Sequence, residues 1–313
     1  MINLEKKKIY VITYHYVREI KNSDNPNIKG LEFYDFKKQI NFLLKNTHIL
    51  NLEEFNQILV SSKIPNKVNI LLTFDDGYID HWKYVFPYLN EKKISGIFYP
   101  PIESLSGYRS LDVNKIHFIL EKEKKRKTIL DDIFDFTKKN LNMKKSDLEL
   151  NNKLLSGRYD DTETILIKRL LQRIIPLTDR EKIINKLFKK YLSISEKEFI
   201  ESLYFNEKQL IEMNRNGMHF GSHGVKHFWW EDLKVKDQMF EISSSIDYLK
   251  KLGINDKDLS VCYPYGSYNK NTLSLLKKMD ISFALTTKVD TLNKKNIKFK
   301  YEIPRLNTND FLI

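Results

Sequence analysis

Two adjacent carboxylates, Asp75 and Asp76, stand in the pentapeptide Thr-Phe-Asp-Asp-Gly at positions 73–77. The apolar run Val68 to Leu72 before them predicts a buried strand that leads directly into the pair. Like charges at the end of a buried strand repel each other in a medium of low dielectric constant. A chain that keeps such a pair is expected to use it, with one aspartate holding a metal ion and the other a proton.

The composition is that of a folded protein with one large core or two modest ones. The 313 residues are 41% hydrophobic and 12% aromatic. No apolar stretch approaches the roughly 18 residues of a membrane span. The first residues contain no apolar segment of the kind found in signal peptides, and the single Cys262 rules out an internal disulfide. These features predict a cytoplasmic protein.

The formal net charge of +12 raises the alternative of a nucleic-acid-binding protein. The basic residues are mostly lysines, spread along the chain between acidic residues, and no zinc-finger spacing or RNA-binding aromatic motif is present. We therefore expect no nucleic-acid partner. Attraction to an anionic substrate, or peripheral contact with a membrane surface, stays open.

Strand and helix signals alternate in the first third and the last third of the chain, which predicts an α/β fold. Strands are expected at 8–14, 68–74, 96–99, 218–221, 259–263 and 281–286, with a short extended piece at 303–306. Helices are expected at 34–45, 52–59, 81–91, 206–214, 235–252 and 271–279. A closed or nearly closed barrel fits this order better than two independent domains.

From about Val113 to about Ser202 the pattern changes to charge-rich helices with almost no strand signal. Amphipathic helices are expected at 165–175 and 181–191, separated by Pro176. We interpret this stretch as a helical insertion within a single catalytic domain that spans residues 1–313. The insertion either packs on the flank of the domain or acts as a lid or docking element.

Two histidines four residues apart, His223 and His227, follow a predicted strand. Active sites of α/β proteins gather at the carboxyl ends of strands. The spacing alone is weak evidence, because paired histidines are often incidental. Together with an aspartate at another strand end, however, two imidazoles form a facial metal set with open positions.

A third signal is the turn Tyr263-Pro264-Tyr265-Gly266, again after a strand. A tight turn can direct a backbone N–H toward a developing oxyanion, although it can also be an ordinary loop. Trp229 and Trp230, just after the second histidine, either stack on a sugar ring or belong to the core, and Pro264 is a further candidate substrate-binding residue.

These elements, in this order, resemble those of the NodB-type polysaccharide deacetylases, carbohydrate esterase family 4. The resemblance covers about two thirds of the chain and implies a distorted (β/α) barrel. It implies that Asp76, His223 and His227 hold a divalent metal ion, Zn²⁺ by expectation. It also implies that Asp75 is the general base and that Tyr265 supplies its backbone N–H, beside Pro264, to the oxyanion.

Two positions depart from the family pattern. An arginine that orients the base is replaced by Cys262, and a late Leu-x-His motif that gives the general acid is absent from residues 284–287. The segment Tyr-His-Tyr-Val at 14–17 resembles the poly-N-acetylglucosamine deacetylase branch, which implies His15 as the acid. Ile-Pro-Arg at 303–305 also resembles that branch, and we expect Arg305 to reach the site and replace the missing arginine.

The sequence thus predicts a metal-dependent hydrolase that removes N-acetyl groups from an amino sugar in a polysaccharide or in its lipid- or nucleotide-linked precursor. An O-acetyl esterase or another amide hydrolase on the same scaffold, and an inactive carbohydrate-binding relative, are the alternatives. The other histidines are expected to be structural, at positions 48, 81, 117 and 219. The sugar, the linkage and the oligomeric state are not predicted.

Overall fold

The computed structural model describes residues 4–142, 160–254 and 259–310, which divide into two units. The first unit is formed by residues within 1–20, 29–109 and 200–313, and the second by residues within 21–28 and 110–199. Within the described residues, no helix is long and apolar enough to cross a membrane.

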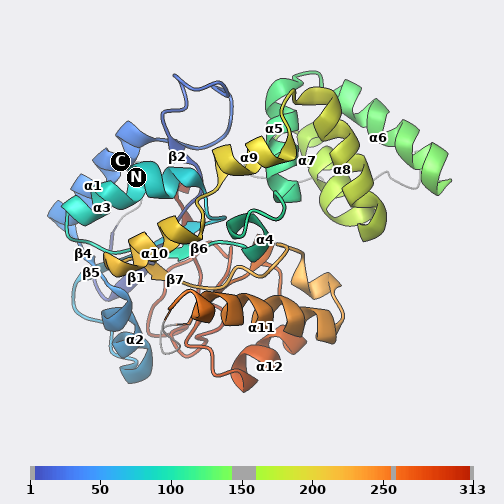
Figure 1. Cartoon of the computed structure of the whole chain (residues 1–313). Helices are drawn as coiled ribbons and strands as arrows, with labels where there is room; N and C mark the ends of the chain where they lie inside the picture. Colours follow the sequence, from blue (N-terminus) through green and yellow to red (C-terminus); the bar gives the residue numbers. More distant parts are fainter. Residues whose placement is uncertain (1–3, 143–159, 255–258, 311–313) are drawn as a thin grey trace. The chain divides into compact units, whose positions relative to one another are not determined.

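Parallel strands form the centre of the first unit (Figure 1). The order in the main sheet is β10 (Leu306–Asn307), β1 (Lys8–Tyr14), β5 (Val68–Asp75), β6 (Ile97–Tyr99) and β7 (His219–Phe220), and β4 (His48–Ile49) also pairs with β5. β1 and β5 pair along their whole length, from Lys8 with Val68 to Tyr14 with Phe74. Because all these pairs are parallel, the carboxyl ends of the strands lie at one edge of the sheet.

Two further strands continue this arrangement. β8 (Val261–Cys262) and β9 (Ala284–Leu285) form a parallel pair. Isolated parallel bridges join Ser222 to Val261 and Leu285 to Ile303, next to β7 and β10 respectively. The strands therefore follow one another around a distorted barrel that continuous ladders do not close. The predicted α/β fold is confirmed, although β7, β8 and β9 are shorter than the sequence predicts.

Alternate side chains of β1 belong to two different cores, as the two-residue period of a strand requires. Tyr10, Ile12 and Tyr14 belong to a large cluster that also includes residues of the surrounding helices. Ile9 and Val11 belong to a second cluster, which combines side chains from β1, β5, β6, β8 and β9 and so lies within the ring of strands.

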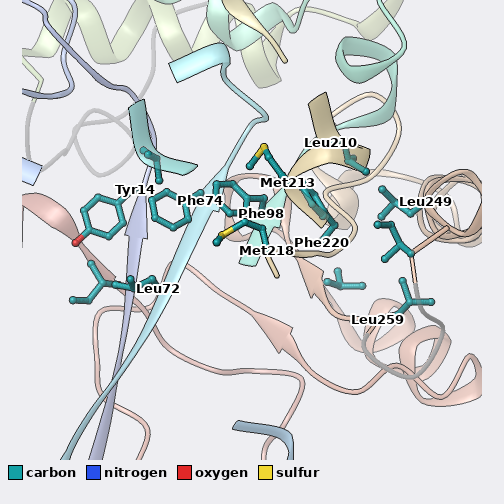
Figure 2. Close-up of a cluster of buried hydrophobic side chains, with 14 of the residues drawn as sticks. Tyr14, Leu72, Phe74, Phe98, Leu210, Met213, Met218, Phe220, Leu249 and Leu259 are labelled. Atoms are coloured by element: carbon teal, nitrogen blue, oxygen red, sulfur yellow. The ribbon is translucent and has the colours of Figure 1, made fainter. Parts of the chain in front are cut away.

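β5 shows the same alternation. Leu72 and Phe74 belong to the large cluster, and Figure 2 shows them beside Tyr14 and Phe98. The ring of Phe74 stacks on Tyr14 at 5.1 Å and on Phe98 at 4.6 Å between centroids. Asp75 projects from the opposite face of the strand and therefore points toward the interior of the barrel.

Helices surround the strands of this unit (Figure 1). They are α1 (Phe33–Asn46), α2 (Leu52–Ser61), α3 (Phe86–Glu91), α4 (Ile102–Leu105), α10 (Glu207–Arg215), α11 (Val235–Lys251) and α12 (Lys270–Lys278). The helix expected at 81–91 begins with a π-helical segment, His81–Val85, before α3. The short strands β2 (Val17–Arg18) and β3 (Leu31–Glu32) pair separately.

The second unit is helical, as expected for most of residues 113–202. Its elements are α5 (Asp112–Lys122), α6 (Arg126–Leu141), α7 (Thr162–Arg169), a π-helical segment Leu170–Ile174, and α8 (Leu177–Tyr191), followed by α9 (Glu196–Leu203). Pro176 precedes α8 and ends the helical segment before it. Residues 143–159 of the predicted insertion lie outside the described residues, and its role as a lid stays a prediction.

Candidate metal and catalytic site

Asp76, His223 and His227 bring one ligand atom each to a common point. Asp76 follows the end of β5, and both histidines follow β7, so the parallel sheet places them at the same edge. Nε2 of His223 lies 3.5 Å and Nε2 of His227 lies 3.4 Å from Oδ1 of Asp76. All three side chains are buried.

The chemistry of this donor set fits a divalent cation. Ligands held at 2.0–2.1 Å around a tetrahedral zinc ion lie about 3.3 Å apart, close to the separations here. Oδ1 of Asp76 is buried and has no hydrogen-bond partner among the described residues, a state that is costly without a counter-charge. Burial lowers the pKa of His227 to about 3, so its imidazole is neutral, the form that binds metals.

The second oxygen of Asp76 is engaged by a neighbouring tyrosine. The hydroxyl of Tyr78 donates to Oδ2 of Asp76 at 2.6 Å. Tyr78 is completely buried, with its ring stacked on Tyr16 at 4.1 Å between centroids. The tyrosine therefore fixes the carboxylate so that Oδ1 faces the histidines, a contact that the sequence analysis did not identify.

The orientation of His223 is fixed from the opposite side of its ring. Nδ1 lies 2.6 Å from the backbone carbonyl oxygen of Cys262 in β8. Because a carbonyl only accepts hydrogen bonds, Nδ1 carries the proton and donates it. With Nδ1 held as the donor, Nε2 faces Asp76 and is the nitrogen that a metal ion would bind in place of a proton.

Three residues of the site adopt the left-handed backbone conformation that side chains other than glycine rarely take. The φ angles are 72° at Asp76, 59° at His227 and 57° at Tyr265. Each such residue costs of the order of 1–3 kcal/mol, and such strain persists where the surrounding structure enforces it. The glycines that follow Asp76 and Tyr265 also have positive φ, so the Asp-Gly and Tyr-Gly pairs were the sequence signals for these turns.

Asp75 has a different environment from its neighbour. Its carboxylate is 2% exposed and forms a bidentate ion pair with Arg305, whose Nη1 lies 2.9 Å from Oδ1 and whose Nη2 lies 2.7 Å from Oδ2. Burial alone would raise the pKa of Asp75, but the charge and hydrogen bonds of Arg305 hold it well below its ordinary value. Asp75 is therefore ionised at neutral pH.

Arg305, immediately before β10, lies inside the barrel with 2% of its surface exposed. Its Nε donates to the carbonyl of Thr286 at 2.9 Å, and its Nη1 also contacts the hydroxyls of Thr13 and Thr73 at 3.0 and 3.3 Å. These contacts fix the guanidinium against Asp75. Arg305 thus occupies the place of the arginine that is expected to orient the base.

Cys262 also contacts the base. Its Sγ lies 3.6 Å from Oδ2 of Asp75, and burial raises the pKa of the thiol, so it remains protonated and donates weakly. Asp75, His223 and Cys262 form a second group of possible metal ligands. The guanidinium of Arg305 on Asp75 opposes a cation there, and the group with Asp76 is the better candidate.

His15, at the end of β1, lies on the Asp75 side of the site. Its Nε2 is 3.9 Å from Oδ2 of Asp75, and 43% of its side chain is exposed. The backbone carbonyl of His15 accepts a hydrogen bond from Nε2 of His81 at 2.8 Å. Burial lowers the pKa of His81 to about 4, so this histidine is neutral and supports the backbone of His15, in keeping with its expected structural role.

The two tryptophans separate into different environments. Trp229 is partly exposed and stacks on Tyr265, with 4.7 Å between ring centroids and 7° between the planes, and Tyr265 in turn contacts His227 at 4.5 Å. Trp230 is 0% exposed and belongs to the core. Pro264 is also buried. The interpretation of Trp230 as a sugar-stacking residue is therefore wrong, because its ring offers no face to a ligand.

Comparisons with known proteins find one family model and several solved structures that this chain resembles. Residues 158–284 match the family model described as polysaccharide deacetylase. The match includes both candidate histidine ligands and the turn at Tyr265, while the two aspartates and Arg305 lie outside it and are brought to the site by the fold. No curated protein matches the sequence significantly.

Solved structures share the fold at low sequence identity. The Streptococcus pyogenes deacetylase PplD, in complex with acetate, has a TM-score of 0.59 at 18% identity, over 96% of this chain and 92% of that one. IcaB from Ammonifex degensii has a TM-score of 0.59 at 14% identity, over 98% and 94% of the two chains. The BpsB deacetylase domain from Bordetella bronchiseptica has a TM-score of 0.54 at 12% identity, over 98% of each chain. Residues 158–284 are thus similar to the polysaccharide deacetylase family model, and the chain shares its fold with these solved deacetylases.

Proposed function

We propose that this protein is a metal-dependent hydrolase that removes N-acetyl groups from an amino sugar in a polysaccharide or in its precursor. The observation that carries the proposal is the buried set Asp76, His223 and His227 directly beside an ionised carboxylate, Asp75. A purely carbohydrate-binding relative has no evident need for all four side chains. The acetate in the Streptococcus pyogenes structure is the product expected of such a reaction.

Asp75 is assigned as the general base. A divalent cation, Zn²⁺ in our proposal, would polarise the acetyl carbonyl and lower the pKa of water to about 7, within reach of a weak base. Asp75 is such a base, since Arg305 keeps it ionised and holds both of its oxygens in place. It accepts the proton of the attacking water as the oxygen of that water bonds to the carbonyl carbon.

Two further groups act on the charges that then develop. We assign the backbone N–H of Tyr265 to the oxyanion, because this residue lies in a turn with positive φ and its ring contacts the His227 ring. His15 is assigned as the acid that protonates the leaving amine, because its partly exposed ring lies beside Asp75. The carbon–nitrogen bond breaks, and acetate and the free amine are released.

The stacked pair of Trp229 and Tyr265 supports a carbohydrate substrate. Sugar rings bind flat aromatic surfaces through their apolar C–H faces, and this pair lies next to the His227 imidazole. The position of the pair therefore suits a sugar whose acetyl group points toward the metal ligands.

Acetate release from a panel of N-acetylated and O-acetylated amino sugars tests the proposal. We expect release from N-acetyl substrates by the zinc-loaded protein, loss of release after treatment with a chelator, and recovery on adding Zn²⁺. Release confined to O-acetyl substrates would assign the protein as an esterase instead. A protein that takes up no metal and releases no acetate would contradict the proposed function.

A further inference from the structure

The two histidine ligands are separated by a short loop, Gly224-Val225-Lys226, whose peptide groups are bonded from two sides. Helix α4 supplies donors: the N–H of Ile102 bonds to the carbonyl of Gly224 at 3.2 Å, and the N–H of Glu103 bonds to that of Val225 at 3.0 Å. The acceptors for the loop's own N–H groups are side chains.

The N–H of Gly224 donates to the hydroxyl of Ser222 at 3.2 Å, and one carboxylate on helix α11 accepts the other two N–H groups. Oε2 of Glu241 accepts the N–H of Val225 at 2.9 Å and the N–H of Lys226 at 3.0 Å. Glu241 is 2% exposed. A single oxygen that binds two successive N–H groups fixes the direction of both peptide planes, and these planes lie between His223 and His227.

Gly224 permits this close approach. Its φ angle is +76°, and a Cβ at this position would lie 2.7 Å from Oε2 of Glu241. A side chain there would displace the carboxylate from the loop. The glycine between the ligands and the glutamate on the distant helix therefore belong to one arrangement.

Neighbouring polar residues on the buried face of α11 have different hydrogen-bond partners. Ser245 lies one turn after Glu241 and pairs with the hydroxyl of Ser222, just before the first histidine. Gln238, one turn earlier, instead donates to the carbonyl of Leu233 at 3.0 Å and accepts from the Thr272 hydroxyl at 2.7 Å. Among the described contacts of α11, those of Glu241 and Ser245 reach the histidine loop and the residue before His223.

A carboxylate in this position is costly for folding. Burial raises the pKa of Glu241 to about 7, because the charged form is poorly solvated even with two N–H donors. A neutral residue would remove this cost, so the glutamate is explained if the loop depends on it.

We propose that Glu241 is a positioning residue that holds the His223–His227 loop in its metal-binding conformation. This inference rests on the proposed metal site, and it assigns to Glu241 the separation and direction of the two imidazoles. Loss of the carboxylate leaves two N–H groups without acceptors. The loop must then become ordered when the metal binds, and the conformational entropy lost in this step weakens the affinity for metal.

The test compares Glu241→Ala, Glu241→Gln and the matched control Gln238→Ala, which removes a buried polar side chain from the same helix. Zn²⁺ affinity is measured by competition with a chromophoric chelator. We expect Glu241→Ala to bind Zn²⁺ about tenfold or more weakly, as when metal ligands lose their supporting hydrogen bonds. Glu241→Gln retains an acceptor oxygen and is expected between Glu241→Ala and the wild type. Gln238→Ala is expected to lower the unfolding temperature and leave Zn²⁺ affinity unchanged.

Hydrogen exchange of the metal-free proteins provides a second readout that does not depend on metal. The amides of Val225 and Lys226 should exchange faster in Glu241→Ala than in the wild type or in Gln238→Ala. Unchanged Zn²⁺ affinity in a folded Glu241→Ala, or unchanged exchange of these amides, would overturn the inference while leaving the proposed function intact. A wild type that binds no Zn²⁺ would overturn both.

Discussion

Asp75 and Asp76 are adjacent in the chain and both buried, but their surroundings differ. Both oxygens of Asp75 are bonded to the guanidinium of Arg305, so its charge is neutralised within the fold. Asp76 receives one neutral hydroxyl from Tyr78, and its other oxygen lies 3.5 and 3.4 Å from two imidazole nitrogens. One strand end therefore supplies two carboxylates with separate tasks. The full ion pair of Asp75 with Arg305 suits a base that must stay ionised. Asp76 lacks such a counter-charge, which suits a ligand of a cation.

Matched substitutions at the two positions give the largest expected effects. Asp76→Asn should weaken Zn²⁺ binding more than about 100-fold, beyond the loss expected for residues that only support a ligand. Asp75→Asn should leave Zn²⁺ affinity nearly unchanged and lower turnover about 10²–10⁴-fold, the contribution of a general base. Metal content and acetate release of the two purified variants check this. Equal loss of metal in both variants would remove the distinction between the aspartates.

Arg305→Met tests how much the ion pair between Asp75 and Arg305 contributes to stability. The methionine fills part of the space but leaves a buried carboxylate without its counter-charge. We expect a loss of about 3–5 kcal/mol in the free energy of unfolding, typical of breaking a buried ion pair on one side. Chemical denaturation of the metal-free protein measures it. The double variant Asp75→Asn/Arg305→Met should recover part of this loss, and failure to recover any would show that Arg305 acts independently of Asp75.

Tyr78→Phe tests the Asp76 side with a smaller change. Removing the hydroxyl frees Oδ2 to rotate toward the histidines, so the carboxylate is no longer held in one orientation. We expect Zn²⁺ affinity to fall about 10–100-fold with turnover per bound metal ion little changed. Titration of metal-free protein with Zn²⁺ checks this. Tyr14→Phe, which removes a buried hydroxyl that has no hydrogen-bond partner among the described residues, is the control and should bind Zn²⁺ like the wild type.

The sequence contains enough local information to predict the barrel strands and the catalytic motifs that follow them. The apolar runs around Val11 and Leu71 become β1 and β5 because each buries both of its faces. The shorter strands are harder to bound: β8 includes only Val261 and Cys262 of the five residues expected, since isolated bridges replace ladders on both sides of the β8–β9 pair.

Contacts between distant parts of the chain account for what the sequence analysis missed. Tyr78, Glu241 and His81 contribute through partners that only the fold brings near, and nothing in their local sequence marks them. The two tryptophans are adjacent and identical in type, so only the direction of the backbone separates the exposed one from the buried one. Arg305 was expected near Asp75 only through a resemblance, and its guanidinium does lie there, 230 positions away in the chain.

The smallest expected effect concerns the support behind His15 and depends on pH. His81 is buried with a pKa of about 4, below the value near 6.5 of an unfolded histidine. Between these values the unfolded chain binds a proton that the native protein does not, so stability is lost as pH falls from 6.5 toward 4. His81 should therefore contribute a loss of about 2 kcal/mol between pH 7.5 and pH 5. His81→Gln keeps an N–H donor for the His15 carbonyl but has no proton to gain, so this part of the pH dependence should disappear in denaturation of the metal-free variant. A pH dependence identical to the wild type would show that His81 is not held neutral by burial.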